Sequence, residues 1–215
     1  MSTTPKQPHI FHITHVDNLA SIIAGEALVS DAQRTDKGVQ VTDIGNSKIK
    51  NRRLGLDVKC HPGTKVGEYV PFYFCPRSIM LYLIHKGNHP DVCYRRGQDD
   101  IIHLEADLNK VVEWATSNNR KWAFSNGNAG TRYTQFFNAL NNLSELNWDA
   151  ISSNNFQESA VKEAKQAEFL FYSNFPWRLF DQIGVINKNV FDKVEKLLIG
   201  AQYKPKVVLK PEWYY

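Results

Sequence analysis

Short apolar segments separated by polar connections run along the whole chain, and their periods predict a mixture of strands and helices. Alternating or continuous apolar residues predict strands at 9–14, 69–74, 99–108, 167–172 and 183–187, and one more within 204–215. Apolar residues at helical spacing predict a helix capped at Gly25, a short helix at 76–87 and an amphipathic helix that ends at Gly200. The composition of residues 158–168 is also typical of a helix.

These elements favour a single α+β domain over residues 1–215. Strands and helices are mixed without the regular strand–helix–strand spacing of a parallel sheet, so we expect a mainly antiparallel sheet. A chain of this length fits one domain of ordinary size. Residues 30–68 are polar and contain several glycines, which predicts a long loop with no more than one short helix.

Composition is that of a globular protein, with 42% hydrophobic and 22% charged residues. No apolar stretch approaches the roughly 18 residues that a membrane-spanning helix needs. The first residues, "MSTTPKQPHIFHITH", lack the apolar core of a signal peptide. We therefore expect a cytoplasmic protein with no membrane partner.

Neither charge nor cysteine content identifies a ligand. The net charge of +4 is compatible with a nucleic-acid partner but does not require one. The three cysteines form no C-x-x-C pair. The best metal-like spacing is that of His85, His89 and Cys93, but Gly87 and Pro90 interrupt the helix that would put them on one face. We expect no metal site.

Several common nucleotide and hydrolase motifs are absent. The chain has no G-x-G-x-x-G, no Walker A sequence and no G-x-S-x-G. These absences leave open the chemistry that a few polar residues on strands and loops would perform.

The segment "YVPFYF" at 69–74 is apolar on both faces of its predicted strand. Alternation places Tyr69, Pro71 and Tyr73 on one face, and Phe72 and Phe74 on the other. One face is expected to pack on the core and the other to line a cavity, where an aromatic ring would stack on a flat heterocycle.

Three polar features each have an ordinary explanation and a functional one. His12 is either a histidine at the edge of the core or a ligand for a hydroxyl group. Arg52 and Arg53 are either a solvated basic pair or an anion site. Glu168, at the start of "EFLFY", is either a solvated strand end or a catalytic carboxylate. Basic and aromatic residues also interleave over 120–137, as they do in grooves for single-stranded nucleic acid and on ordinary amphipathic surfaces.

The order of these residues along the chain is more specific than any one of them. A strand histidine, a strand tyrosine and a late strand glutamate resemble the constellation of NAD-dependent ADP-ribosyltransferases. The motifs "HITHVDNL", "YVPFYFCPRSIMLY", "QAEFLFYSNFPW" and "EWYY" are similar to the DarT family of DNA ADP-ribosyltransferase toxins. This resemblance extends from about His9 to Tyr215 and implies an ADP-ribosyltransferase-like (PARP-like) fold.

The resemblance implies a role for particular residues, with NAD as co-substrate and no metal. Glu168 matches the catalytic glutamate, and Arg53 matches an arginine that reaches NAD and the target base. The positions implied to bind NAD are His12, Thr14, Ser21, Leu28, Arg53 and Tyr73. Those expected to contact DNA are Arg77, Met80 and Lys121, with the segment from about Asn119 to Glu168 gripping the strand.

The implied activity is that of a toxin that ADP-ribosylates N3 of thymidine in single-stranded DNA, releases nicotinamide and blocks replication. A duplex would bury N3 in a base pair, which favours a single strand. The implied partner is a macrodomain antitoxin of the DarG type. The alternatives are a guanosine or protein acceptor, or a non-catalytic nucleic-acid-binding module.

Two points stay open within the resemblance. Arg53 acts either as an electrostatic stabiliser of the deprotonated base, which its permanent charge favours, or as a proton acceptor. The chain departs from family patterns at Ile79, where proline is frequent, and at Asn128, where some relatives have histidine.

Overall fold

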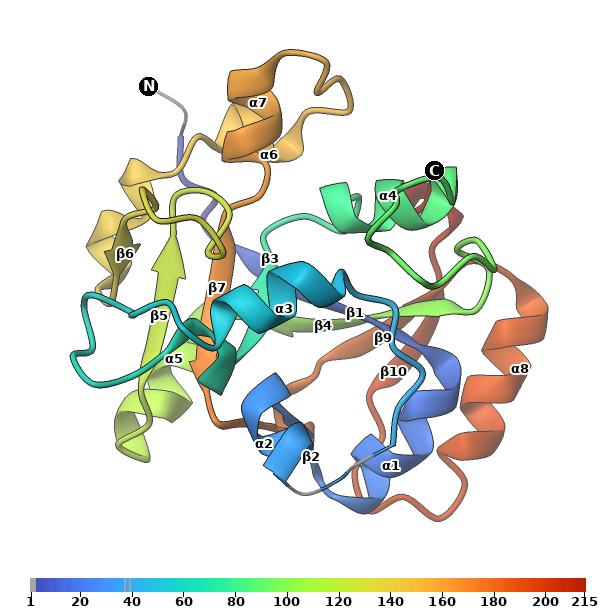
Figure 1. Cartoon of the computed structure of the whole chain (residues 1–215). Coiled ribbons are helices and arrows are strands. Elements are labelled where there is room, and N and C mark those ends of the chain that lie inside the picture. Colours follow the sequence, from blue (N-terminus) through green and yellow to red (C-terminus); the bar gives the residue numbers. More distant parts are fainter. Residues whose placement is uncertain (1–2, 37, 39) are drawn as a thin grey trace.

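The computed structural model describes residues 3–36, 38 and 40–215. Figure 1 shows an extended sheet at the centre with helices on both sides. Along the sheet the strands follow the order β10-β9-β4-β1-β3-β7-β5-β6. Their bounds are β1 (His9–His15), β3 (Tyr69–Tyr73), β4 (Ile101–Asp107), β5 (Trp122–Ser125), β6 (Phe136–Phe137), β7 (Glu168–Tyr172), β9 (Gln182–Val185) and β10 (Lys206–Leu209). A separate pair is formed by β2 (Ala27–Val29) and β8 (Asn174–Pro176).

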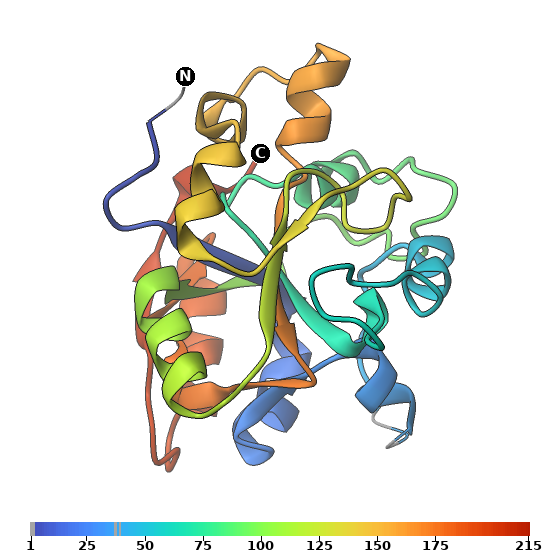
Figure 2. The ribbon, with the colours of Figure 1, turned by 90° about the vertical axis from the view of Figure 1, so that its left-hand side faces the viewer.

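The helices are short. The α-helices are α1 (Leu19–Ala24), α2 (Asp31–Asp36), α3 (Ser47–Arg53), α4 (Ile79–Lys86), α5 (Leu108–Ser117), α6 (Trp148–Ser152), α7 (Ser159–Ala164) and α8 (Lys188–Leu197). The 3-10 turns are η1 (Val16–Asn18), η2 (Val66–Glu68), η3 (Leu140–Glu145), η4 (Trp177–Leu179) and η5 (Pro211–Trp213). Figures 1 and 2 together place α3 on one side of β7 and α5 on the other.

The predicted α+β class and mainly antiparallel sheet are confirmed. Among the described strand pairs of the large sheet, β9 with β10 is the parallel one, and the others are antiparallel. Each predicted strand exists within two residues of its expected start, and the closing strand is the short β10. No helix in the described ranges is long and apolar enough to cross a bilayer.

The expectation for residues 30–68 was wrong, because two α-helices form there, not one at most. Asn46 caps α3, its side chain accepting a hydrogen bond from the backbone N–H of Ile49. The helix predicted at 76–87 begins only at Ile79, since Ser78 caps it by accepting from Leu81 N–H. Elements that the hydrophobic pattern did not single out are α5, α6, β2, β5, β6 and β8.

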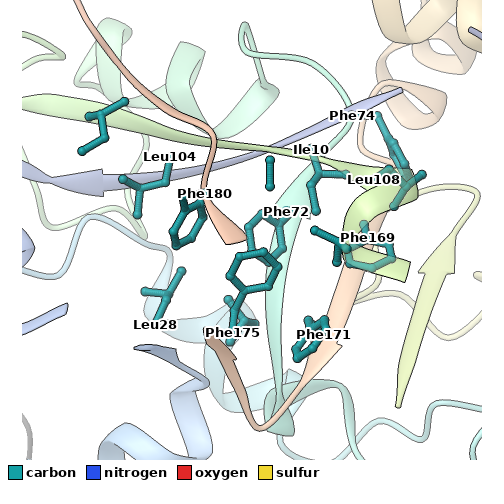
Figure 3. Packing of buried hydrophobic residues seen from close by; sticks show 14 of the residues in the cluster. Ile10, Leu28, Phe72, Phe74, Leu104, Leu108, Phe169, Phe171, Phe175 and Phe180 are labelled. Atoms are coloured by element: carbon teal, nitrogen blue, oxygen red, sulfur yellow. The ribbon is translucent and has the colours of Figure 1, made fainter. Parts of the chain in front are cut away.

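A cluster of phenylalanines holds the strands of the site together (Figure 3). Phe72 of β3 and Phe169 of β7 are fully buried, and Phe175 packs 4.7 Å from both Phe72 and Phe180 between ring centroids. Because a strand alternates its faces, this packing sends Phe72 into the core and its neighbour Tyr73 to the opposite side. The core therefore fixes the backbone from which Tyr73 and Glu168 project.

Candidate active site

A cavity of about 370 Å³ lies beside the β3–β7 pair. Its walls come from β1, α1, β2, α2, the connection at 41–46, α3, β3, α4 and the start of β7. Eight of the predicted site residues line it: His12, Thr14, Ser21, Leu28, Arg53, Tyr73, Met80 and Glu168. The fold thus gathers residues separated by more than 150 positions in the chain into one pocket, and the Tyr73 face of β3 lines it as expected.

Glu168 is a buried, paired carboxylate and not a solvated strand end. It is the first residue of β7, and only 4% of its surface is exposed. Its Oε2 accepts a hydrogen bond from Arg53 Nη1 at 2.8 Å, and its Oε1 accepts from the same nitrogen at 3.1 Å. The backbone N–H of Ala129 also donates to Oε1, at 3.0 Å. Three hydrogen bonds therefore fix the direction of this carboxylate.

The backbone of Glu168 is also fixed by hydrogen bonds and strand pairing. Its N–H donates to Ser125 Oγ at 3.2 Å, and Ser125 Oγ donates to the carbonyl of Gly127 at 2.7 Å. Across the sheet, Glu168 pairs directly with Tyr73 in antiparallel register, which puts both side chains on one face. The glutamate is thus positioned by β3, by β5 and by the turn at 125–130.

Arg53 lies at the end of α3 and is almost as buried as its partner. Burial alone would lower its pKa, but the carboxylate of Glu168 and the hydrogen bonds to it outweigh that effect, and the pKa is raised. Arg53 Nη2 is buried and has no hydrogen-bond partner among the described residues. The guanidinium therefore stays charged and keeps one donor for a molecule in the cavity.

The phenol of Tyr73 is neutral at physiological pH. Burial raises its pKa, and the nearby Glu168 carboxylate raises it further. The ring therefore offers an apolar face and a hydroxyl beside the Arg53–Glu168 pair, without adding charge.

His12 presents a hydrogen-bond acceptor to the cavity. Its Nδ1 lies 2.8 Å from the carbonyl of Pro71, which accepts only, so this nitrogen carries the proton. Burial lowers the pKa of His12 to about 4, although the bond to Pro71 works in the opposite direction. The imidazole is consequently neutral at pH 7, and its Nε2 is left as an acceptor for a hydroxyl donor.

Asn18 is a polar residue of the cavity wall that the sequence analysis did not single out. Asn18 Nδ2 donates to Thr14 Oγ1 at 3.0 Å, and Asn18 Oδ1 accepts from the N–H of Thr42 at 2.8 Å. This links β1 to the connection before α3. Asn18 stands six residues after His12 in the "HITHVDN" run, but nothing in its local pattern distinguishes it from an ordinary helix cap.

The two positions that depart from the family pattern also lie at the cavity. Asn128 Nδ2 donates to Gln166 Oε1 at 3.0 Å, and its Oδ1 accepts from the N–H of Gly130 at 2.8 Å. It thereby orders the turn whose Ala129 N–H reaches Glu168. Ile79 is buried as the first residue of α4.

Two predicted DNA-contacting residues lie elsewhere. Arg77 lines a second cavity, of about 520 Å³, with its guanidinium 4.5 Å from the ring centre of Tyr215. Lys121 lies beside Tyr172, whose ring centre is 5.6 Å from the lysine nitrogen. Tyr172 ends β7, so it is about 13 Å along the strand from Glu168. The structure does not bring Lys121 to the carboxylate.

Metal ligands do not cluster in the part of the chain that the structure describes. No group of three or more histidine, cysteine, aspartate or glutamate side chains is arranged to hold an ion there. Beside β3 and β7, the cavity offers the Arg53–Glu168 ion pair, the Tyr73 phenol and the neutral His12 imidazole.

Known proteins are similar to this chain in sequence and in fold. The family described as "ssDNA thymidine ADP-ribosyltransferase, DarT" matches residues 11–215. A DNA ADP-ribosyl transferase of Thermus sp. (strain 2.9) is 35% identical over 216 residues, covering 99% of each chain. Thermus sp. 2.9 DarT in complex with ADP-ribosylated ssDNA matches with a TM-score of 0.90 at 33% identity, over 100% of this chain and 99% of that one. The same protein in complex with NAD+ matches with a TM-score of 0.83 at 32% identity, over 99% and 100%.

Proposed function

This chain belongs to the DarT family of single-stranded-DNA thymidine ADP-ribosyltransferases, and on that premise we propose which of its residues carry out the transfer. As a member of the family it is an NAD-dependent enzyme that ADP-ribosylates thymidine in single-stranded DNA. The observation that carries the residue assignment is the buried Arg53–Glu168 pair, 2.8 Å long, in the wall of the large cavity.

The first step breaks the N-glycosidic bond between nicotinamide and C1′ of the adjoining ribose. Positive charge develops at C1′ as nicotinamide leaves, and a carboxylate close to the ribose stabilises that charge. Glu168 is the carboxylate that we assign to this role. Its three hydrogen bonds fix its direction in advance, so little reorganisation is needed when the charge appears.

In the second step, N3 of thymine loses its proton and attacks C1′, and the new N3–C1′ bond neutralises the positive charge on the ribose. We assign to Arg53 the stabilisation of the negative charge that the deprotonated base carries before this bond forms. The raised pKa of Arg53 disfavours its use as a proton acceptor, and the unpartnered Nη2 supports a direct contact with a carbonyl oxygen of the thymine base. The released proton then passes to water.

The remaining cavity residues bind NAD in this proposal. Tyr73 packs beside the nicotinamide, and His12 accepts a hydrogen bond from a hydroxyl of the adenosine ribose. Thr14 lies on the same strand as His12, while Ser21 and Leu28 contact the nucleotide mainly through backbone. All of these residues line the cavity.

DNA reaches the site from the side of α4. Met80 lines the cavity and is assigned to the target base, and Arg77, which lines the second cavity, is assigned to a phosphate. Lys121 lies beside Tyr172, at the opposite end of β7 from Glu168. We therefore assign it to a DNA phosphate that is several nucleotides away from the target base.

The wider biology is inferred from the family resemblance. We propose that transfer to thymidine N3 blocks replication, that the protein is a toxin of one domain spanning residues 1–215, and that a DarG-like macrodomain antitoxin removes the mark. NAD and DNA occur together in the cytoplasm, where we place the enzyme. The guanosine, protein and non-catalytic alternatives lack support from the family match.

A mass assay tests the assignment. Protein, NAD and a short thymidine-containing single strand are incubated, and the strand should gain one ADP-ribose, whereas a strand without thymidine should not. Glu168→Gln should slow the gain by about 10²–10³-fold. Glu163→Gln is the matched control, since Glu163 is exposed on α7 and is not among the residues that line the cavity. Transfer by Glu168→Gln at the wild-type rate would refute the role of this carboxylate.

A further inference from the structure

Four charged side chains of alternating sign line the same cavity as His12. Asp31 and Arg34 lie on α2, Asp43 lies in the connection that follows, and Lys50 lies on α3. Lys50 Nζ is 2.6 Å from Asp43 and 3.5 Å from Asp31, and Arg34 Nη2 is 3.2 Å from Asp31 and 3.9 Å from Asp43. Both cations are therefore neutralised by carboxylates within the cavity wall.

Asp31 is the carboxylate of this set that acts on His12. Asp31, Lys50 and His12 all line this cavity, and the charges of Asp31 and Lys50 act on the imidazole in opposite directions. His12 itself offers only an acceptor there, because its Nδ1–H is committed to Pro71. The region around the His12 Nε2 thus suits a hydroxyl donor and disfavours an anion.

We propose that Asp31 and the acceptor nitrogen of His12 make this cavity select NAD and reject NADP. The inference rests on the proposed function, in which His12 holds the adenosine ribose. NAD has a hydroxyl at the adenosine 2′ position, and NADP has a phosphate there. A phosphate dianion has no proton to donate to His12 Nε2, and it would meet the carboxylate of Asp31.

The same chemistry decides cofactor choice in other dinucleotide sites, where a carboxylate accepts from the ribose 2′-hydroxyl of NAD and an arginine accommodates the 2′-phosphate of NADP. In this cavity both kinds of group are present. Arg34 and Lys50 are able to bind a phosphate, but Asp31 and Asp43 occupy them. Removal of the Asp31 charge should therefore relieve repulsion and leave Asp43 as the one carboxylate of this set facing two cations, so that positive charge becomes available at the 2′ position.

The test compares kcat/KM for NAD and for NADP with one thymidine-containing single strand. The product from NADP is recognised by the mass of one additional phosphate. Like-charge contacts cost several kcal/mol, so the wild-type enzyme should prefer NAD by about 10²-fold or more. In Asp31→Asn the preference should fall by at least about tenfold, through a gain with NADP. Asp36→Asn, on the same helix but exposed and outside the cavity lining, should keep the wild-type ratio.

A second pair of variants guards against misfolding. Asp43→Asn releases Lys50 from its 2.6 Å partner and should shift the ratio in the same direction by a smaller factor. Adding Lys50→Gln to Asp31→Asn should reverse most of the gain with NADP. Activity of each variant with NAD shows that it is folded.

The outcomes separate the two proposals. A wild-type enzyme that transfers nothing from NAD would overturn the proposed function. A wild-type enzyme that uses NADP as well as NAD, or Asp31 and Asp43 variants that keep the wild-type ratio, would overturn the selectivity inference alone.

Discussion

Glu168→Gln breaks the ion pair with Arg53, and this one change should affect both stability and catalysis, which makes it the most informative substitution. Glutamine keeps the size of the side chain but removes the charge that neutralises Arg53, whose own surface is only 8% exposed. Breaking a buried ion pair from one side costs about 3–5 kcal/mol, because a buried charge is left uncompensated. For a chain of this length each kcal/mol lowers Tm by about 2–4 °C, so a fall of roughly 6–20 °C is expected.

Catalysis should respond more strongly than stability. Loss of one preorganised group that stabilises transition-state charge lowers kcat by about 10²–10³. The double variant Arg53→Met with Glu168→Gln separates the two effects. The double variant removes both charges, so no uncompensated charge stays buried, and it should melt at a higher Tm than Glu168→Gln while remaining inactive.

The assay is a thermal melt without NAD, followed by oligonucleotide mass analysis on the same preparations. A double variant whose Tm loss equals the sum of the two single losses would show that Arg53 and Glu168 are not energetically coupled. A wild-type-like Tm for Glu168→Gln would refute the argument that the carboxylate compensates a buried charge.

Three further predictions follow from the site. His12 has its pKa lowered from 6.5 to about 4, so the unfolded chain binds the proton first, and acidification across this range should cost up to roughly 3 kcal/mol. Melts from pH 7 to 4 should therefore be flatter for His12→Gln than for wild type, and equal slopes would contradict this. Ser125→Ala leaves the Glu168 N–H unsatisfied, so it should lower the free energy of unfolding by about 1–3 kcal/mol. It should also lower kcat with KM for NAD unchanged, and a change confined to KM would argue against a role for Ser125 in positioning Glu168. Arg77→Ala should weaken single-strand binding and reduce its salt slope by about one, measured by titration at several salt concentrations, and an unchanged slope would exclude a phosphate contact.

Much of the fold was readable from local patterns. The alternation in "YVPFYF" identified β3 and correctly separated the Phe72 face, which packs in the core, from the Tyr73 face, which lines the cavity. The helix ending at Gly25 and the helix before Gly200 were readable because apolar spacing and terminal glycines coincide. Segment 30–68 was not, since α2 and α3 are held by caps and ion pairs and contribute few buried apolar residues.

Part of the site was likewise readable from the sequence, and part was not. The motifs around His12, Tyr73 and Glu168 indicated the chemistry, because those residues sit on strands that the hydrophobic pattern defines. The sequence did not indicate that Arg53 would bind Glu168, a contact across 115 positions, or that Ala129 N–H would reach the same carboxylate. Nor did it show that Asp31, Asp43 and Lys50 meet at the cavity.

By itself, the sequence determined most of the element types and the family, and it predicted residues for the cleavage of NAD, because these depend on side-chain chemistry, characteristic motifs and short-range periodicity. Only the tertiary structure decided which charges are paired, which are buried and which nitrogen of His12 remains an acceptor. Those properties depend on desolvation and on contacts between distant segments, and they turn a strand-end glutamate into a fixed, buried carboxylate.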